Sequence, residues 1–95
     1  MAEIRDSAFV VSQVGSSWQV GDKAIVRSVQ LADFVAALAF VNEVGRIAEE
    51  LNHHPDIDIR WNTVTLTCST HDAGGLTDYD IELSQRIDVL VEQFA

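Results

Sequence analysis

The sequence Asp-Ile-Asp-Ile-Arg-Trp-Asn-Thr-Val-Thr-Leu-Thr-Cys-Ser, residues 56–69, alternates apolar and polar side chains with a period of two. This alternation is typical of strands that bury one face and leave the other in water. Its apolar members are Ile57, Ile59, Trp61, Val64, Leu66 and Cys68. A two-residue turn at Asn62-Thr63 would pair Trp61 with Val64 and bring all six to one face. We therefore predict an antiparallel hairpin in this register.

A helical period precedes the hairpin, from Leu31 to about Asn52. Pro55 pushes the residue before it out of the α region, so the helix should end near Asn52. Two apolar lines run along this helix: one holds Leu31, Phe34, Val35, Leu38, Val41, Ala48 and Leu51, and the other holds Phe40, Val44 and Ile47. One small sheet would not cover so wide an apolar surface, so we expect the helix to self-associate.

Shorter patterns flank these two elements. Residues 18–29 read as a hairpin around a polar turn at Gly21-Asp22. A last helix should open at Thr77, because Asp80 three positions later completes an approximate capping box. Its expected buried stripe is Leu83, Ile87, Leu90 and Phe94. Residues 1–15 have no clear period, and the sequence does not indicate which element they form.

The composition limits the classes of function. The 95 residues suffice for one domain with a modest core, and no apolar run approaches the roughly 20 residues of a membrane span. A net charge of −9 repels phosphate backbones, so we expect no nucleic-acid partner and a weakly charged small molecule instead. Because the single cysteine, Cys68, forms no internal disulfide and no secretory signal is visible, the cytoplasm is the expected compartment.

All three histidines lie between Glu49 and Asp80. Extending the predicted strand pairing places His54 opposite His71 on the polar face, while His53 ends the preceding helix. Glu49, one helical turn before His53, is placed to hold the ring of His53. The sequence therefore predicts that three imidazoles, which titrate near neutral pH, converge at one corner. Further acceptors at this corner would come from Asp72 and Asp80, and Gly74-Gly75 would leave room for a ligand.

Simpler interpretations remain open. Two adjacent histidines at a helix end commonly serve only as a cap and a turn, and His71 alone would be an ordinary surface residue. A zinc site is disfavoured because sequence neighbours rarely reach the same metal and Cys68 faces the core. Cys68 is for the same reason expected to be core filler rather than a nucleophile.

Several of these residues occur together in a pattern that resembles the pterin-4a-carbinolamine dehydratase family. The pattern consists of Glu-Glu-Leu-Asn-His-His-Pro at 49–55, Trp61-Asn62, Ser-Thr-His at 69–71, Gly-Leu-Thr at 75–77, and Asp80. The likeness runs from about Trp18 to the last helix. Two departures are the poor fit of residues 1–15 to the helix with which the family usually begins, and the presence of Ile57 where some relatives carry an aromatic residue.

The resemblance implies a single α+β domain over residues 1–95, with a four-stranded antiparallel sheet and two or three helices packed on one face. It implies a hydro-lyase that dehydrates 4a-hydroxytetrahydropterin to quinonoid dihydropterin in tetrahydrobiopterin recycling. No metal or other cofactor is implied, no membrane is involved, and relatives form homodimers or homotetramers. His53 and His71 would be the acids for the departing hydroxyl, and His54 would bind the ring and assist removal of the N5 proton. The implied substrate-binding or orienting residues are Glu49, Pro55, Thr70, Asp72 and Asp80.

Two other functions stay open at this point. The same fold could serve as a protein-binding regulatory module, with a helix face around Phe40 and Val44 as its surface. Alternatively, the dehydratase could act on another reduced pterin, such as one related to the molybdenum cofactor.

Overall fold

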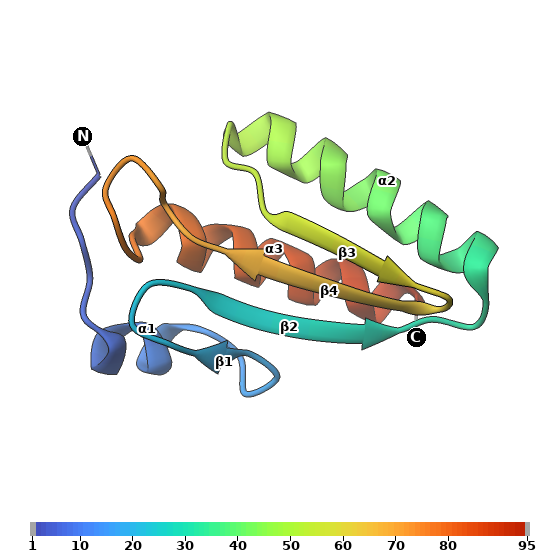
Figure 1. The fold of residues 1–95 in the computed structure, drawn as a ribbon, viewed down its shortest axis with the longest axis horizontal. Coiled ribbons are helices and arrows are strands. Elements are labelled where there is room, and N and C mark those ends of the chain that lie inside the picture. Colours follow the sequence, from blue (N-terminus) through green and yellow to red (C-terminus); the bar gives the residue numbers. More distant parts are fainter. Residues whose placement is uncertain (1, 95) are drawn as a thin grey trace.

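The computed structural model describes residues 2–94 and contains three helices and four strands in the order α1-β1-β2-α2-β3-β4-α3 (Figure 1). The helices are α1 (Ser7–Gln13), α2 (Phe34–Leu51) and α3 (Asp78–Phe94). The strands are β1 (Gln19–Val20), β2 (Ile25–Gln30), β3 (Asp56–Arg60) and β4 (Thr63–Cys68). All strand pairs are antiparallel, and the strand order in the sheet is β1-β2-β4-β3. The predicted α+β class and the four-stranded sheet are confirmed.

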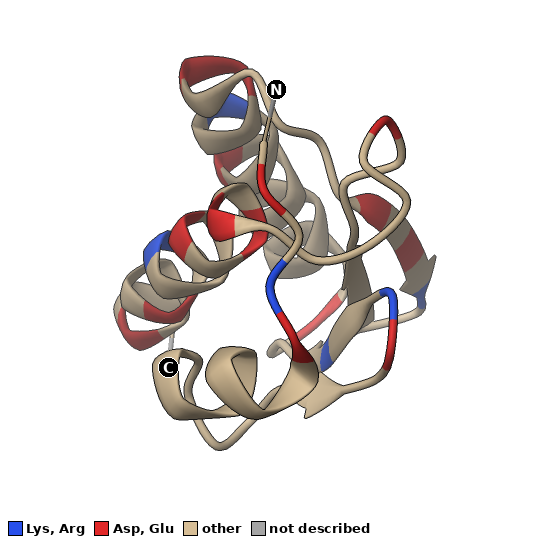
Figure 2. Cartoon of the chain, turned by 90° about the vertical axis from the view of Figure 1, so that its left-hand side faces the viewer, with Lys and Arg blue, Asp and Glu red and all other residues tan. Residues whose placement is uncertain are grey.

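Helices α2 and α3 lie side by side across one face of the sheet (Figures 1 and 2). The core between the two layers takes the inward side chains of β2 and β4 and the facing stripes of both helices. It includes Ile25, Val29, Phe40, Val44, Ile47, Val64, Leu66, Cys68, Leu83, Ile87 and Leu90. Phe94 closes the far end, where its ring meets that of Phe40 edge-on at a centroid distance of 5.5 Å. The stripe predicted for the last helix is therefore confirmed.

The β3–β4 hairpin is confirmed, but its predicted register is wrong by two residues. Ile59 pairs with Val64 and Ile57 pairs with Leu66, so the turn residues are Trp61-Asn62 rather than Asn62-Thr63. Trp61 has φ 54°, a left-handed conformation that is unusual for a large side chain. A shift of two preserves the side-chain faces because the strand period is two. The predicted division of side chains between the two faces of the hairpin therefore holds, although the predicted turn does not.

Helix α1 forms in the N-terminal segment, where the sequence pattern left the element undetermined. The side chain of Asp6 accepts a hydrogen bond from the backbone N–H of Phe9 at 2.8 Å and caps the helix. Val10 is the buried residue of this helix, so the segment offers no apolar period to detect. The helix packs beside β1 at the edge of the sheet.

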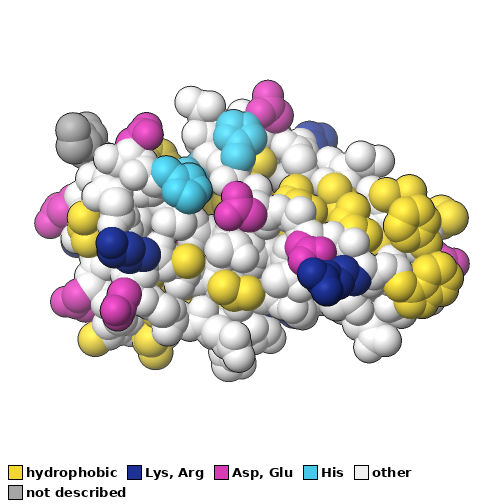
Figure 3. All heavy atoms as spheres, in the orientation of Figure 1, with side chains coloured by type: hydrophobic (Ala, Val, Ile, Leu, Met, Phe, Trp, Pro, Cys, Tyr) yellow, Lys and Arg dark blue, Asp and Glu magenta, His cyan; other side chains and the backbone are white. Residues whose placement is uncertain are grey.

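The exposed side of α2 also differs from the prediction. Phe40 and Val44, taken as a surface for partners, are completely buried. The exposed apolar residues of this helix are instead Phe34, Val35 and Leu38, of which Val35 is 74% exposed. Figure 3 shows apolar side chains gathered at the end of the molecule where α2 starts and the β3–β4 hairpin turns. Within residues 2–94, no helix has the length and apolar character needed to cross a membrane.

Candidate active site

A cavity of about 210 Å³ opens where the end of α2 and the loop after β4 approach each other. All three histidines line it, and the full lining is Asn52, His53, His54, Ser69, Thr70, His71 and Asp72. Figure 3 shows two histidine side chains close together on this face of the molecule. Larger cavities of about 360 and 370 Å³ lie between α2 and α3 and beside α1, but neither is lined by histidine. The predicted convergence of His53 and His54 with His71 is thus what the fold produces.

The chain reaches this arrangement through a left-handed residue at the end of α2. Asn52 has φ 50° and ψ 44°, and its backbone N–H donates to the carbonyls of Ala48 and Glu49. Asn is one of the few residues other than glycine that adopts this conformation readily. The chain then leaves the helix axis through His53 and His54 and enters β3 after Pro55. As a result, two residues adjacent in sequence have different partners.

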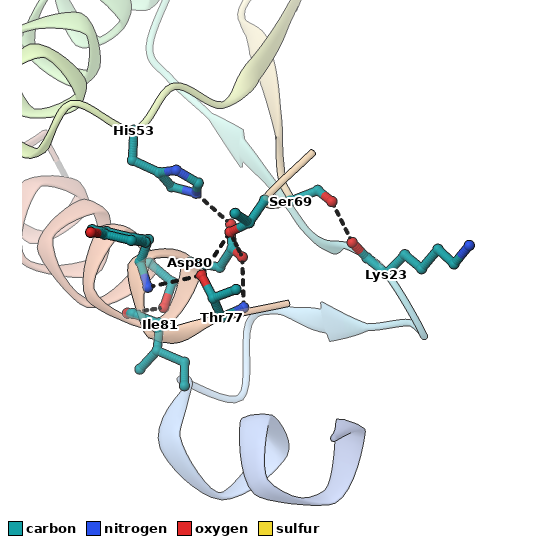
Figure 4. A network of polar contacts seen from close by, with 9 residues as sticks. Lys23, His53, Ser69, Thr77, Asp80 and Ile81 are labelled. Carbon is teal, nitrogen blue, oxygen red and sulfur yellow. Dashed lines mark hydrogen bonds and ion pairs between the residues drawn. The ribbon is translucent and has the colours of Figure 1, made fainter. Parts of the chain in front are cut away.

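His53 is held by Asp80, whose carboxylate lies in the first turn of α3 (Figure 4). His53 Nε2 and Asp80 Oδ1 are 2.7 Å apart, with 11% of the histidine side chain and none of the aspartate side chain exposed. The other carboxylate oxygen, Oδ2, accepts the hydroxyl of Thr70 at 2.8 Å and the backbone N–H of Thr77 at 3.0 Å. The carboxylate half of the predicted capping box is therefore present, whereas the Thr77 hydroxyl accepts from the backbone N–H of Tyr79 rather than that of Asp80. The same carboxylate also binds a histidine.

The hydroxyls around Asp80 form a directed chain. Because Thr70 donates its proton to Asp80, the hydroxyl of Thr77 must donate to Thr70 across their 2.7 Å contact. Thr77 then accepts from the backbone N–H of Tyr79 at 3.2 Å. Each donor in this chain points toward the carboxylate, so Asp80 sits in a site built for an ionised acceptor.

An ionised carboxylate only accepts hydrogen bonds, so Nε2 of His53 carries the hydrogen of the shared bond. Within residues 2–94, Nε2 is the ring nitrogen of His53 that has a protein hydrogen-bond partner. Every fully buried side-chain nitrogen or oxygen in this part of the chain has such a partner. Nδ1 is therefore accessible to solvent or to a ligand. A neutral His53 would present Nδ1 as an acceptor, and a protonated His53 would present it as a donor.

His54, rather than His53, is the partner of Glu49, which corrects the predicted pairing. His54 Nε2 lies 2.5 Å from Glu49 Oε2, and both side chains are largely exposed. The prediction assumed that the helix continues to His53. The left-handed turn at Asn52 instead brings the ring of His54, rather than that of His53, to Glu49. His54 lines the cavity, whereas Glu49 does not.

His71 sits on a loop that folds back on itself. Thr70 and Gly75 form an isolated antiparallel bridge, and Gly74 has φ 78°, which glycine adopts without strain. His71 is not paired with His54 in the sheet as predicted, because β3 starts only at Asp56 and β4 ends at Cys68. Its side chain is exposed, and no residue between 2 and 94 accepts or donates a hydrogen bond to its ring.

The other predicted site residues divide into two groups. Asp72 lines the cavity, and Thr70 lines it while its hydroxyl is engaged with Asp80 and Thr77. Pro55 does not line the cavity. Sequence reasoning missed Asn52 and Ser69 as lining residues, although the αL tendency of Asn before a His-His-Pro sequence is a usable signal for the former.

Cys68 is excluded from the chemistry of this site by its surroundings. Its side chain is fully buried in the core, as predicted. Burial raises the pKa of the Cys68 thiol to about 12, with smaller contributions from the charges of Asp80 and Asp56. The thiolate, which is the nucleophilic form, is therefore negligible at neutral pH. Between residues 2 and 94, no group of three or more His, Cys, Asp or Glu side chains is arranged to hold a metal ion.

Comparison with known proteins gives a consistent result. Residues 2–90 match the family model described as pterin 4 alpha carbinolamine dehydratase. A Nocardia farcinica protein provisionally named as such a dehydratase is 55% identical over 73 residues, covering 77% of each chain. A Roseiflexus castenholzii protein with the same provisional name is 44% identical over 93 residues, covering 96% of this chain and all of the relative.

Two solved structures share the fold. A Brucella melitensis protein titled transcriptional coactivator/pterin dehydratase is similar with a TM-score of 0.80 and 30% identity, over 88% of this chain and 90% of that one. A pterin dehydratase-like protein, titled as a RuBisCO assembly factor of the alpha-carboxysome, is similar with a TM-score of 0.63 and 19% identity, over 78% of this chain and 86% of that one.

Proposed function

Because the chain belongs to the pterin-4-alpha-carbinolamine dehydratase family, we propose that it removes water from a 4a-hydroxytetrahydropterin to give the quinonoid dihydropterin. The observation that carries this proposal is the cavity lined by all three histidines, one of which is bound to a buried carboxylate. The activity would be that of a hydro-lyase in tetrahydropterin recycling.

The reaction requires two proton transfers and no change of oxidation state overall. The C4a–O bond breaks as the oxygen takes a proton and leaves as water. The lone pair of N5 forms the C4a=N5 double bond, and N5 then loses its own proton. A positioned acid and a positioned base each contribute typically 10²–10⁴-fold to such a step. Imidazole suits both roles because its ordinary pKa lies near neutrality.

We assign the acid role to His53 and His71, which enter the cavity from separate segments. At His53 the proton would pass through Nδ1, since Nε2 is bound to Asp80. His54 would lie along the pterin ring and assist removal of the N5 proton, with Glu49 holding its imidazole. Asp80 and Thr70 would orient His53 rather than touch the substrate, because Asp80 is fully buried and both are engaged with each other.

The direct test is a stopped-flow assay with chemically generated 4a-hydroxytetrahydropterin, in which spontaneous dehydration provides the baseline. The wild-type protein should shorten the lifetime of the carbinolamine. His53→Ala and His71→Ala should each lower the catalysed rate roughly 10²-fold or more. Circular dichroism should show that the variants remain folded. Full wild-type rates in the folded variants His53→Ala, His54→Ala and His71→Ala would contradict the proposal.

A protein-binding role is the second candidate. It is supported by the exposed apolar residues Phe34, Val35 and Leu38 on α2 and by the coactivator title of the Brucella melitensis relative. The partner we favour is a second copy of this chain, giving a homodimer or homotetramer. Edge strand β3 exposes Ile57 and the adjoining turn exposes Trp61, and Figure 3 shows apolar side chains gathered at the end of the molecule where this turn and the start of α2 lie. Val35→Asp should weaken association in analytical ultracentrifugation while dehydration by the cavity persists.

A further inference from the structure

Tyr79 directly precedes Asp80 in the first turn of α3, and its ring stacks against the imidazole of His53. The two ring centroids are 5.6 Å apart and the planes differ by 29°. Tyr79 does not line the histidine cavity, so its ring reaches that cavity only through His53. The backbone N–H of Tyr79 is fixed by the hydroxyl of Thr77, which ties this residue to the same network as Asp80.

A hydrogen bond to Asp80 does not by itself fix the plane of His53. The bond holds Nε2 in place and the main chain holds Cβ, but the imidazole can still turn about the line that joins Cβ to Nε2. Nδ1 lies off this line, so such a turn would move the nitrogen that faces a ligand. An aromatic ring stacked on one side of the imidazole resists the turn, because the two rings would lose their contact.

We infer that Tyr79 is a positioning residue of the dehydratase site, which sets the plane of His53 and so the direction of its Nδ1. This inference rests on the proposed function, since it assigns His53 a proton to transfer. The first turn of α3 then holds the imidazole at two places: Asp80 binds an edge and Tyr79 covers a face.

A purely structural role accounts poorly for Tyr79. Tyr79 is 51% exposed, so it adds little to the core. Within residues 2–94 its hydroxyl has no hydrogen-bond partner, so the part of the side chain that acts is the ring. A phenylalanine at this position should therefore serve as well as the tyrosine.

The test compares Tyr79→Ala with Tyr79→Phe, with Val89→Ala as a control at an exposed position of the same helix. In the carbinolamine assay, Tyr79→Ala should lower kcat about two- to tenfold, the range that an aromatic contact is worth. KM should not change, because Tyr79 does not line the cavity. Tyr79→Phe and Val89→Ala should keep wild-type kcat.

Proton NMR of the three histidine rings gives a readout that is independent of turnover. The His53 ring protons, assigned by their loss in His53→Ala, should shift in Tyr79→Ala as the ring current is removed and stay in place in Tyr79→Phe. Unchanged His53 resonances in Tyr79→Ala, or equal losses of kcat in both variants, would overturn the inference. If the wild-type protein fails to dehydrate the carbinolamine, the proposed function falls. Nuclear Overhauser contacts from the His53 ring protons to neighbouring side chains then decide whether Tyr79 orients His53, since these contacts change in Tyr79→Ala only if the imidazole turns.

Discussion

At the scale of single residues, the pairing of His53 with Asp80 governs what the cavity can do. The carboxylate is fully buried and accepts hydrogen bonds from an imidazole, a hydroxyl and a backbone N–H. These donors compensate the burial of the carboxylate charge, as a buried carboxylate requires. The orientation of His53 and the start of helix α3 therefore both depend on the two carboxylate oxygens of Asp80.

Asp80→Asn is expected to separate geometry from charge at this position. The amide keeps the size of the carboxylate, but it cannot accept from His53, Thr70 and Thr77 together, because one of its two ends is a donor. We expect kcat to fall by roughly 10²-fold or more and the free energy of unfolding to drop by about 1–3 kcal/mol. The carbinolamine assay and urea denaturation measure the two effects.

Asp58→Asn serves as the matched control for this substitution, because Asp58 is exposed on β3 and contacts Arg60. It should leave kcat and the urea midpoint close to wild type. Wild-type kcat in Asp80→Asn would mean that the charge of Asp80 has no part in orienting His53.

Residue partners were the least predictable part of the site. The residues that line the cavity followed from where the helix and the hairpin end, since both ends meet at one corner. The partner of Glu49 could not be predicted in this way, because a single left-handed residue, Asn52, decides which of the two histidine rings faces the helix. Tyr79 had no periodicity or motif of its own, and only the packing of α3 under His53 gives it a role.

At the scale of elements, the turn between β3 and β4 is the clearest departure from expectation. Trp61 has φ 54°, whereas Asn62 is not among the positive-φ residues and donates its side-chain N–H to the carbonyl of Leu31 at 3.0 Å. A positive φ at the first of two turn residues is the pattern of a type II′ turn, which glycine suits best. The sequence carries tryptophan there, so turn propensity pointed to the wrong pair.

Trp61→Gly should therefore stabilise the folded chain. Trp61 is 68% exposed, so little packing is lost, while the left-handed conformation costs a large side chain more than it costs glycine. We expect a gain of about 0.5–1 kcal/mol in the free energy of unfolding, measured by urea denaturation of dilute protein.

The neighbouring Asn62→Gly is the control for the turn substitution. It removes the hydrogen bond to Leu31 and should cost about 1 kcal/mol instead. A loss of stability in Trp61→Gly would show that the exposed indole contributes more than its conformation costs.

Elements with a long apolar period were predictable, and the short one was not. Helices α2 and α3 have buried stripes that fix their spans to within a few residues, and alternation alone identified β3 and β4. Helix α1 buries Val10 and begins with a side-chain cap at Asp6. Seven residues with one buried position do not produce a period, so tertiary contact with β1 rather than sequence pattern sustains this helix.

At the scale of the whole molecule, the charge distribution bears on which pterin could bind. The chain carries a net charge of −9, and acidic residues are spread over both long helices and the loops (Figure 2). The residues that line the histidine cavity include Asp72 but neither lysine nor arginine, and Glu49 lies beside it with a side chain 78% exposed. A substrate with a phosphate group would approach this surface against repulsion.

We expect a 4a-hydroxypterin with an uncharged side chain to be dehydrated with a higher kcat/KM than one that carries a phosphate. The difference should narrow as ionic strength rises from about 10 mM to about 150 mM, because the Debye length falls from about 30 Å to about 8 Å. The uncharged substrate is the internal control, since its kcat/KM should vary little with salt. Equal kcat/KM values at low salt would contradict this expectation and favour a phosphorylated pterin.

The sharing of one aspartate between a helix cap and a histidine ties two properties that other proteins can adjust separately. Capping boxes commonly use Glu or Gln at this position, and either could begin α3. Neither Glu nor Gln would keep the imidazole of His53 in its present position, because each adds a methylene between the backbone and the accepting oxygen. A substitution at position 80 that still allows the chain to fold would therefore lower the catalytic rate. Selection for catalysis thus also preserves the residue that begins the helix.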